Sequence, residues 1–428
     1  MSTSEKCAEY IRQVCQQVAN KEVHDTIALE LENHLAEKIE DYQAFGYSEE
    51  ESVEKAIAEM GDPVTVGGYL HQAHKPRMEW SILAIVTVLI GIGLLTMYSL
   101  SLAQDRGEMF TKQLAGILGG VAVFLGILFT DYRRLKRYSK LLFFSTMLLL
   151  LCTSYRGTLV NGVYHLDLGF TLLNISVHSP FLLVVAMAGM FTDWDWNKRR
   201  TIVWTFLLFL PPFFLLGTLN LFAALVYAVG FFVLLFSTPA RKRMLLSLAS
   251  LFFVSGCCIA YQAIRPYHLN RLLAYLDPYS DPNGAGYTII QSMKTVASAG
   301  LWGNGFGSRL DTVPVIESDF IFTFLVHNFG LATGSVVVLL GILLFHRLLR
   351  AKQRVKDPYG ALLMSGLMAL LFLPYFWGIF MTVGLVPLTS VNLPFISYGI
   401  TPFVQQMVLV GLLLGIYRRK DLQPRNHK

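Results

Sequence analysis

The acidic side chains of the polar stretch Arg271–Phe324 are the residues of this chain whose types and positions could do chemistry. The stretch lies between apolar segments and carries five carboxylates: Asp277, Asp281, Asp311, Glu317 and Asp319. Asp319 is the sharpest candidate, because it begins the apolar run Phe320–Val326 and is therefore expected at a membrane boundary. Partial desolvation there suits a carboxylate to accept a proton. The alternative is a helix N-cap, a position that Asp also favours.

Glycines and a short apolar pattern predict how this stretch is built. The glycines allow tight turns and close approach of the backbone to a ligand; they are Gly284, Gly286, Gly300, Gly303, Gly305 and Gly307. The spacing of Ile289, Met293 and Val296 predicts a short helix lying on the membrane, with Gln291 and Lys294 toward polar surroundings. The alternative is a disordered loop, which the many Leu, Ile, Tyr and Trp residues disfavour.

A second polar cluster occurs in Pro387–Gly399, close to the C-terminus. Pro394 and Gly399 bracket the pair Ser397-Tyr398 at the top of an apolar segment. Broken backbone at membrane depth tends to line a cavity, so we expect this segment to face one. A kinked helix start is the alternative. His327 is expected to be a buried, hydrogen-bonded residue rather than a catalytic one.

The elements that position these residues are predicted to be membrane-spanning helices. The chain has 428 residues, of which 54% are hydrophobic and only 15% charged, whereas soluble domains carry about 25% charge. We therefore expect an all-α, polytopic membrane protein. Its ten predicted spans are about 80–103, 112–130, 139–155, 175–192, 201–218, 220–237, 244–263, 318–346, 359–387 and 394–417.

The distribution of basic residues predicts the orientation of these spans. The formal net charge is +6, but the basic residues sit in short clusters between apolar runs, which argues against nucleic acid as a partner. The clusters occur in alternate loops, for example Arg133–Lys140 and Arg347–Lys356. The positive-inside rule then places both termini in the cytoplasm and the loop at about 264–318 outside it. No signal-peptide pattern begins the chain, and the five cysteines lack metal-ligand spacing.

Residues 1–77 form a separate module in this interpretation. They are charged, carry no long apolar run and show helical periodicity. Ser48 with Glu51 predicts a capping box, and Asp62-Pro63 predicts the start of a further helix. The pattern around Glu30, Glu32, His34 and Leu35 resembles a short accessory domain found ahead of various bacterial membrane proteins. His34 is expected to be a solvated helical residue, and we predict no metal ligand.

At these residues, over about 80–420, the chain resembles the FtsW/RodA/SpoVE family, also called SEDS proteins. Glu317–Phe322 is similar to the family's H-T-D-F-I-F, Leu393–Gly399 to its L-P-F-x-S-Y-G, and Tyr98–Ser101 to its Y-S-x-S. The remaining matches to the family's large loop are Arg271, Leu276, Asp277, Pro278, Asp281, Pro282, Gly284, Gly286, Tyr287, Gln291, Ser292, Ser298, Gly300, Leu301, Gly303 and Gly305.

The resemblance implies a peptidoglycan glycosyltransferase that polymerises lipid II, usually with a class B penicillin-binding protein, in a bacterial plasma membrane. It implies that Asp319 is the catalytic residue, deprotonating the acceptor hydroxyl. No cofactor is certain, and a divalent cation is left open. The residues implied to bind substrate are Arg271, Asp277, Gly286, Tyr287, Gln291, Ser292, Ser397 and Tyr398.

The chain departs from the family pattern at several positions. The family's Q-P-S-E-x-x-K aligns with Val177–Leu183, where Pro180 and Leu183 replace the Glu and the Lys. The pattern G-A-R-R-W is degraded around 162–166, and E-E-L-G is replaced by His327–Gly330. Two alternatives therefore stay open: a transporter of the lipid-linked precursor, and a non-enzymatic scaffold with residues 1–77 as adaptor.

Overall fold

The computed structural model describes residues 3–73, 78–160, 163–167, 169, 172–195, 207–208, 210–218, 220–238, 250, 254, 273–284 and 286–420. The chain forms two compact units, Met1–Met78 with Arg418–Lys428, and Glu79–Tyr417. Each unit is described by itself.

The first unit is a small helical bundle with its own apolar core. Its elements are α1 (Thr3–Gln17), the 3₁₀ turn η1 (Lys21–Val23), α2 (His24–Ala44), α3 (Glu49–Met60) and α4 (Pro63–Ala73). Side chains of α1 and α2, such as Val14 and Ile27, are almost fully buried. The predicted capping box is confirmed, since the Ser48 side chain accepts from the Glu51 amide and the Glu51 carboxylate accepts from the Ser48 amide. Asp62 caps α4 by accepting a hydrogen bond from the Thr65 amide.

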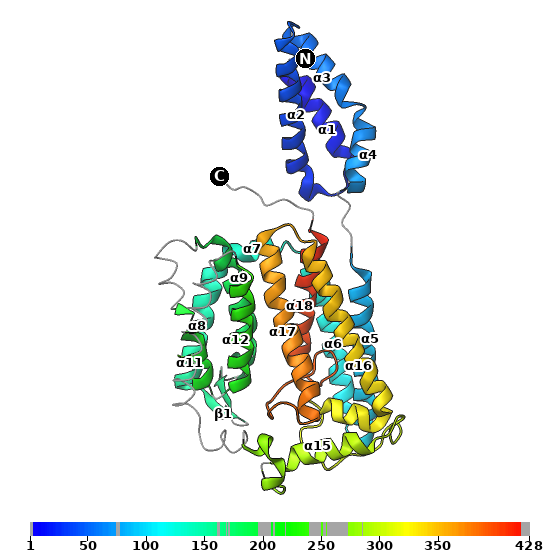
Figure 1. The fold of residues 1–428 in the computed structure, drawn as a ribbon, viewed down its shortest axis with the longest axis vertical. Helices are drawn as coiled ribbons and strands as arrows, with labels where there is room; N and C mark the ends of the chain where they lie inside the picture. Colours follow the sequence, from blue (N-terminus) through cyan, green and yellow to red (C-terminus); the bar gives the residue numbers. More distant parts are fainter. Residues whose placement is uncertain are drawn as a thin grey trace. The chain divides into compact units, whose positions relative to one another are not determined.

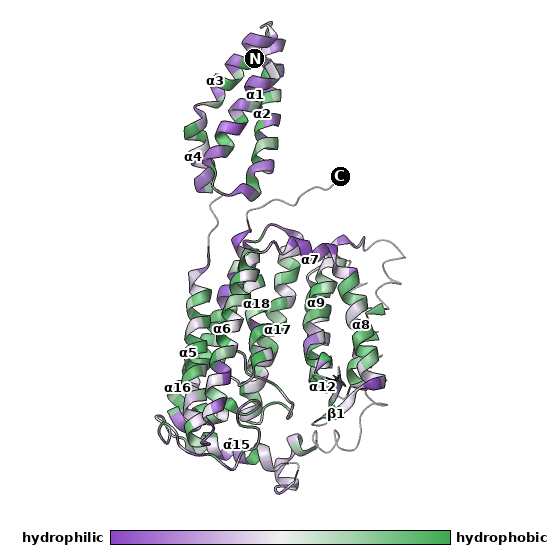
Figure 2. Ribbon diagram, turned by 180° about the vertical axis from the view of Figure 1, so that it is seen from behind, coloured by the Kyte–Doolittle hydropathy of each residue, from purple (hydrophilic) through white to green (hydrophobic). Residues whose placement is uncertain are grey.

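The second unit is a bundle of long apolar helices (Figure 1). Among the described residues, six helices are long and apolar enough to cross a membrane. Figure 2 shows hydrophobic residues along these helices and hydrophilic residues on the short helix α7 at one end. The six are α5 (Trp80–Ala103), α6 (Gly107–Phe129), α9 (Ile175–Asp193), α16 (Ile321–Gln353), α17 (Pro358–Thr382) and α18 (Ile400–Arg418).

The other predicted spans are shorter or only partly described. Helix α8 (Ser139–Arg156) covers the third predicted span, while α11 (Leu210–Gly217) and α12 (Leu221–Phe236) cover parts of the fifth and sixth. The predicted span 244–263 lies almost wholly outside the described residues. Five boundaries differ from the prediction by three residues or more: α6 begins at Gly107, α16 runs from Ile321 to Gln353, α17 ends at Thr382 and α18 begins at Ile400. Hydropathy could not detect the end of α17 or the start of α18, because the loop between these helices is itself largely apolar.

The expectation of an all-α chain was wrong in one place. Between α8 and α9, the strands β1 (Thr158–Val160), β2 (Val163–Asp167) and β3 (Leu172–Leu173) form an antiparallel sheet in the order β1-β2-β3. Thr158 pairs with His165, and Leu166 pairs with Leu173. The strands have two to five residues, too few for an alternating pattern to stand out from the apolar background.

A buried contact fixes the end of the bundle that carries α7 (Arg133–Arg137). The hydroxyl of Tyr132 donates to Asp357 Oδ2 at 2.7 Å, and Asp357 also caps α17 by accepting from the Gly360 amide. Burial, reinforced by the Asp357 carboxylate, raises the pKa of Tyr132 well above its ordinary value. The start of α17 and the basic helix α7 therefore lie at the same end of the bundle.

The predicted short helix at the other end is confirmed as α15 (Tyr287–Ser298). It runs across the ends of the long helices rather than along them (Figure 1). Ile289 and Ile290 are buried beneath it, while Lys294 is exposed. The amphipathic spacing therefore seats this helix on the end of the bundle, beside the start of α16.

Candidate functional site

Asp319 lies in a tight turn immediately before α16. The backbone carbonyl of Val315 accepts hydrogen bonds from the amides of Ser318, Asp319 and Phe320 at 3.2–3.4 Å. Val315 adopts φ of 52°, in the left-handed region that a β-branched residue rarely occupies. Such strain persists only where the surroundings hold it, and it clusters at functional sites. The position of Asp319 is therefore set by the main chain of its own turn.

Asp319 is not the N-cap residue of α16. Phe320 occupies that position, so the alternative that Asp319 is the N-cap was wrong. Asp319 Oδ1 instead accepts hydrogen bonds from the hydroxyls of Ser318, at 3.3 Å, and Ser390, at 3.4 Å. The carboxylate is partly buried, while Ser390 is exposed. Asp319 thus faces the loop that follows α17.

That loop packs directly against the turn of Asp319. The buried hydroxyl of Ser397 donates to the Ser318 carbonyl at 2.7 Å and accepts from the Leu393 amide at 2.7 Å. The Tyr398 amide donates to the Glu317 carbonyl at 2.9 Å. The two motifs, far apart in sequence, are therefore joined by hydrogen bonds to Glu317 and Ser318, the two residues that precede Asp319. The segment is irregular backbone rather than the start of a helix, because α18 begins only at Ile400.

Two further helices hold the loop by polar groups that the sequence reasoning missed. Gln113 on α6 is almost fully buried, and its Oε1 accepts from the Gly399 amide at 3.0 Å. Gln406 on α18 accepts from the amide of Phe395 at 2.8 Å. Phe395 has φ of 70°, a second strained non-glycine residue beside this site. A signal was available for both glutamines, since polar residues within apolar spans are uncommon and tend to have a defined partner.

A cavity of about 430 Å³ opens next to this loop. Its walls come from the β-sheet, α9, α12, α17, α18 and the loop itself, and Ser390 joins its lining to Asp319. The prediction that Pro387–Gly399 faces a cavity is confirmed. The polar lining side chains are His165, Asn174, His178, Asn220, Ser390, Asn392, Thr401, Gln405 and Gln406.

The described lining of this cavity mixes apolar and polar side chains and carries no fixed charge. Within the described chain, its lining residues include no Asp, Glu, Lys or Arg. His178 on α9 contacts Gln405 on α18 through Nδ1 and Oε1, a pairing in which Nδ1 donates to the amide oxygen. Of the residues aligned with the family's fourth-span motif, Pro180 lines the cavity, whereas Leu183 is fully buried.

Two residues expected to bind substrate, Ser292 and Gly286, are in contact with other parts of the protein instead. Ser292 is fully buried; its hydroxyl lies 2.7 Å from Thr323 Oγ1 and donates to the Thr382 carbonyl at 2.9 Å. It ties α15 to α16 and α17 rather than facing a ligand. Gly286 permits close approach of its own chain, because an added Cβ would lie 2.0 Å from the Pro278 carbonyl oxygen. Close packing, not a ligand, explains both.

The other expected substrate residues are less constrained. Tyr287 and Gln291 are partly buried on α15, and Tyr398 is partly buried beside the turn of Asp319. Asp277 is exposed, with its carbonyl accepting from the Ser280 amide within a local turn. Arg271 lies outside the described residues. The structure thus brings Asp319, Ser397 and Tyr398 together and leaves Asp277 in a separate turn.

Two glycines let the polar loop cross α16. Helix α16 is interrupted at Gly330, with φ of 82°, and an added Cβ there would lie 2.1 Å from the Leu301 carbonyl oxygen. Gly303, with φ of 77°, is equally close to Asn328, its added Cβ lying 2.4 Å from that carbonyl oxygen. The loop amides satisfy the carbonyls that the break frees, as in the bond from the Asn304 amide to the His327 carbonyl at 2.8 Å.

Side chains of the replaced E-E-L-G motif complete this crossing. Asn328 is almost fully buried; its Oδ1 accepts from Ser99 on α5 at 3.1 Å and from the Ser308 amide at 2.9 Å. His327 Nδ1 lies 2.9 Å from Asn304 Nδ2, which confirms the expected hydrogen bonding. The expected burial of His327 was wrong, because the residue is partly exposed. In the described residues no group of three or more His, Cys, Asp or Glu side chains could hold a metal ion.

Comparisons with known proteins match this architecture over most of the chain. A family model described as "Cell cycle protein" matches residues 79–422. "Peptidoglycan glycosyltransferase MrdB" of Escherichia coli K12 is 27% identical over 356 residues, covering 81% of this chain and 95% of that protein. "Stage V sporulation protein E" of Bacillus subtilis is 28% identical, covering 79% of this chain and 96% of that protein.

Solved structures share the same fold. A chain from a study of polymerization and crosslinking by a peptidoglycan synthase complex aligns with a TM-score of 0.67 and 23% identity, covering 81% of this chain and 99% of that one. The rod shape determining protein RodA of Thermus thermophilus aligns with a TM-score of 0.60 and 21% identity, covering 81% of this chain and 98% of that one. At these identities the alignments establish the fold alone.

Proposed function

Because the chain belongs to the FtsW/RodA/SpoVE family, we propose that it is a peptidoglycan glycosyltransferase that polymerises lipid II, with Asp319 as the general base. The observation that carries this proposal is the placement of Asp319. Main-chain bonds from Val315 and from the 387–399 loop hold its turn, while Ser390 connects its carboxylate to the polar cavity. The names of the relatives support the same activity.

In this mechanism Asp319 removes the proton from the acceptor sugar hydroxyl. The hydroxyl oxygen then attacks the anomeric carbon of the donor, forming the new glycosidic bond. The bond between that carbon and the diphosphate oxygen breaks, and the polyprenyl diphosphate leaves. Positioned general bases contribute about 10²–10⁴-fold to such steps. The hydroxyls of Ser318 and Ser390 orient the carboxylate by donating to Oδ1.

The uncharged side chains of the cavity suit the neutral part of such a substrate. Amides and hydroxyls of the cavity lining can donate to and accept from sugar hydroxyls and peptide groups. Because the described lining residues carry no fixed charge, binding a neutral sugar would bury no unpaired charge and would avoid that desolvation cost. Tyr287, Gln291 and Tyr398, which lie at partly buried positions, are proposed as further substrate contacts.

The same proposal extends to topology and partner. The basic helix α7 lies at the end of the bundle opposite α15 (Figures 1 and 2). The basic residues of α7 support the proposal, by the positive-inside rule, that both termini are cytoplasmic and that Asp319 lies on the outer side of the membrane. A class B penicillin-binding protein is the expected partner. The chain that shares this fold comes from a structure of a peptidoglycan synthase complex, in keeping with such a partner.

One assay tests the enzymatic proposal against its two alternatives. Purified full-length protein is incubated with labelled lipid II, alone and with candidate class B penicillin-binding proteins. Wild type should form polymer, and Asp319→Asn should lower the rate by about 10²–10⁴-fold. The matched control is Asp311→Asn, which neutralises an exposed carboxylate in the same loop and should leave the rate unchanged.

The remaining outcomes discriminate among the functions. Absence of polymer from wild type under every condition would overturn the glycosyltransferase proposal, and full activity of Asp319→Asn would overturn the role of Asp319. Precursor movement across vesicles that is insensitive to Asp319→Asn would indicate a transporter instead. Parallel reactions with EDTA, restored by Mg²⁺ or Mn²⁺, decide whether a divalent cation is required.

A further inference from the structure

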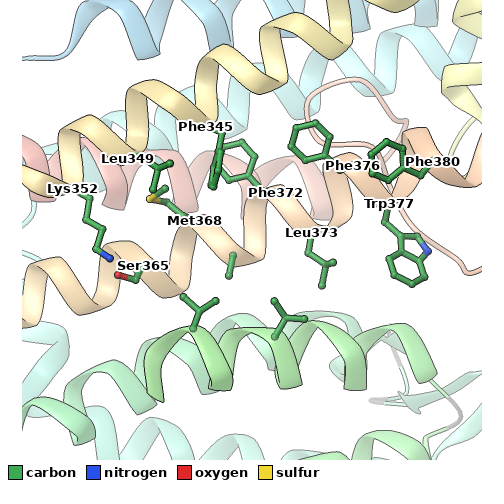
Figure 3. A pocket seen from close by; sticks show the side chains of 13 residues that line it. Phe345, Leu349, Lys352, Ser365, Met368, Phe372, Leu373, Phe376, Trp377 and Phe380 are labelled. Atoms are coloured by element: carbon green, nitrogen blue, oxygen red, sulfur yellow. The ribbon is translucent and has the colours of Figure 1, made fainter. Parts of the chain in front are cut away.

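A second cavity, of about 510 Å³, lies on the other side of α17 from the polar cavity. It is an apolar groove between α12, α16 and α17 (Figure 3). It shares no lining residue with the polar cavity. The contact between Phe222, which lines the polar cavity, and Trp377, which lines the groove, forms part of the wall between them, with ring centroids 5.5 Å apart.

The groove has the dimensions and lining of a site for an acyl chain. Aromatic side chains form much of its surface, including the pair Phe345 and Phe372, whose ring centroids are 4.6 Å apart. Along α17 it runs from Ser365 to Phe380, roughly 22 Å at about 1.5 Å per residue. One leaflet of a bilayer core is about 15 Å thick. The groove can therefore take an acyl chain over its full depth in one leaflet.

One end of the groove carries a cation. Lys352 and Ser365 both reach into this end (Figure 3), which is also the end of the bundle occupied by α7. Lys352 is only partly exposed, and in the part of the chain that the structure describes it has no ion-pair partner. The Ser365 hydroxyl donates to the Ala361 carbonyl at 2.8 Å, which leaves its lone pairs available. An ammonium at the end of an apolar groove is complementary to an anionic headgroup above an acyl chain.

We propose that this groove binds an anionic phospholipid of the leaflet on the α7 side, with an acyl chain between α12, α16 and α17 and the phosphate on Lys352. A transmembrane helix from a partner protein would satisfy the aromatic surface but would leave the ammonium without an anion. The site is separate from Asp319 and from the polar cavity, so this proposal does not depend on the polymerase activity.

Lipid binding by the full-length protein tests the proposal. Protein in detergent is titrated with phosphatidylglycerol or phosphatidylcholine of the same acyl chains, and bound lipid is counted by native mass spectrometry. Wild type should bind phosphatidylglycerol roughly fivefold more tightly, the effect of one juxtamembrane cation. Lys352→Gln should abolish this preference and retain weak binding of both lipids. Ala369→Trp, which fills the groove, should weaken the binding of both.

The control removes the same charge outside the groove. Lys356 is exposed in the loop after α16 and does not line the groove, so Lys356→Gln should keep the preference. Equal affinity of wild type for the two lipids overturns the proposal, as does equal loss of preference in both lysine variants. If Ala369→Trp leaves lipid binding unchanged and abolishes co-purification with a partner's membrane helix, the groove is a protein interface and the proposal is wrong.

Discussion

The turn of Asp319 and the α9 wall of the polar cavity are built on different physical principles. The turn is held by hydrogen bonds to main-chain carbonyls: three amides donate to the Val315 carbonyl, and the loop containing Ser397 donates to the carbonyls of Glu317 and Ser318. The α9 wall presents side chains, among them His178 in contact with Gln405. The turn fixes the position of a carboxylate. The α9 wall supplies hydrogen-bond donors and acceptors from side chains, which can be exchanged without changing the main chain.

This difference accounts for where the chain keeps and loses the family's motifs. Main-chain geometry depends on glycines, strained positions and close crossings, which tolerate few substitutions. A side-chain wall tolerates exchange, provided that polar groups remain satisfied. Asp319–Phe322 and the glycine Gly330 match the pattern that the chain resembles, whereas the side chains before Gly330 and the fourth-span Glu and Lys are replaced. We infer that the first region sets the chemistry and the second sets affinity.

The largest expected effect comes from the crossing of the loop and α16. Gly303→Ala places a Cβ 2.4 Å from the Asn328 carbonyl oxygen at a positive φ. It should destabilise the full-length protein by about 3 kcal/mol, measured by denaturant unfolding in detergent. Gly305→Ala is the matched control, because Gly305 also has a positive φ but nothing within 4 Å; it should cost about 1 kcal/mol. Equal losses of stability in the two variants would show that the positive φ, rather than the close contact at the crossing, determines the effect.

A smaller effect is expected where the two motifs meet. Ser397→Ala removes the bonds to the Ser318 carbonyl and from the Leu393 amide and leaves the buried Leu393 amide and the partly buried Ser318 carbonyl without that partner. We expect a loss of about 2 kcal/mol in the free energy of unfolding. We also expect kcat to fall about tenfold, because the turn of Asp319 is no longer held in position. Steady-state polymerisation of lipid II checks this. Ser298→Ala, at an exposed position on α15, serves as control, and an unchanged kcat in Ser397→Ala would contradict the anchoring role.

The smallest effect tests the other region. His178→Ala removes a partly buried hydrogen-bonding side chain from the cavity lining and should raise KM roughly fivefold, the effect of one neutral hydrogen bond, with little change in kcat. Phe181→Leu, an apolar change in the same lining, should alter neither parameter strongly. A fall in kcat as large as that of Asp319→Asn would show that α9 takes part in the chemistry and would remove the distinction between the two regions.

Much of the site could be predicted from local sequence. Asp319 and the Ser397-Tyr398 pair stand out as polar residues at the ends of apolar runs, and the spacing within α15 is enough to predict that helix. Burial reversed other expectations. Ser292 looks like a polar loop residue in the sequence, yet it bonds to Thr323 and to the Thr382 carbonyl in the core. Gly286 was expected to let the backbone approach a ligand, and it instead packs against the Pro278 carbonyl.

The sequence by itself determined the class of protein, the order of its helices and the identity of the candidate base, because hydropathy, periodicity and motif spacing are local properties of a chain. Tertiary structure alone decided which groups meet. Ser397 and Ser318 are 79 residues apart, and Gln113 lies 286 residues from Gly399. Such pairs form only when helices pack, since packing decides which buried polar groups can satisfy one another. The same packing separates a polar cavity at Asp319 from an apolar groove ending at Lys352.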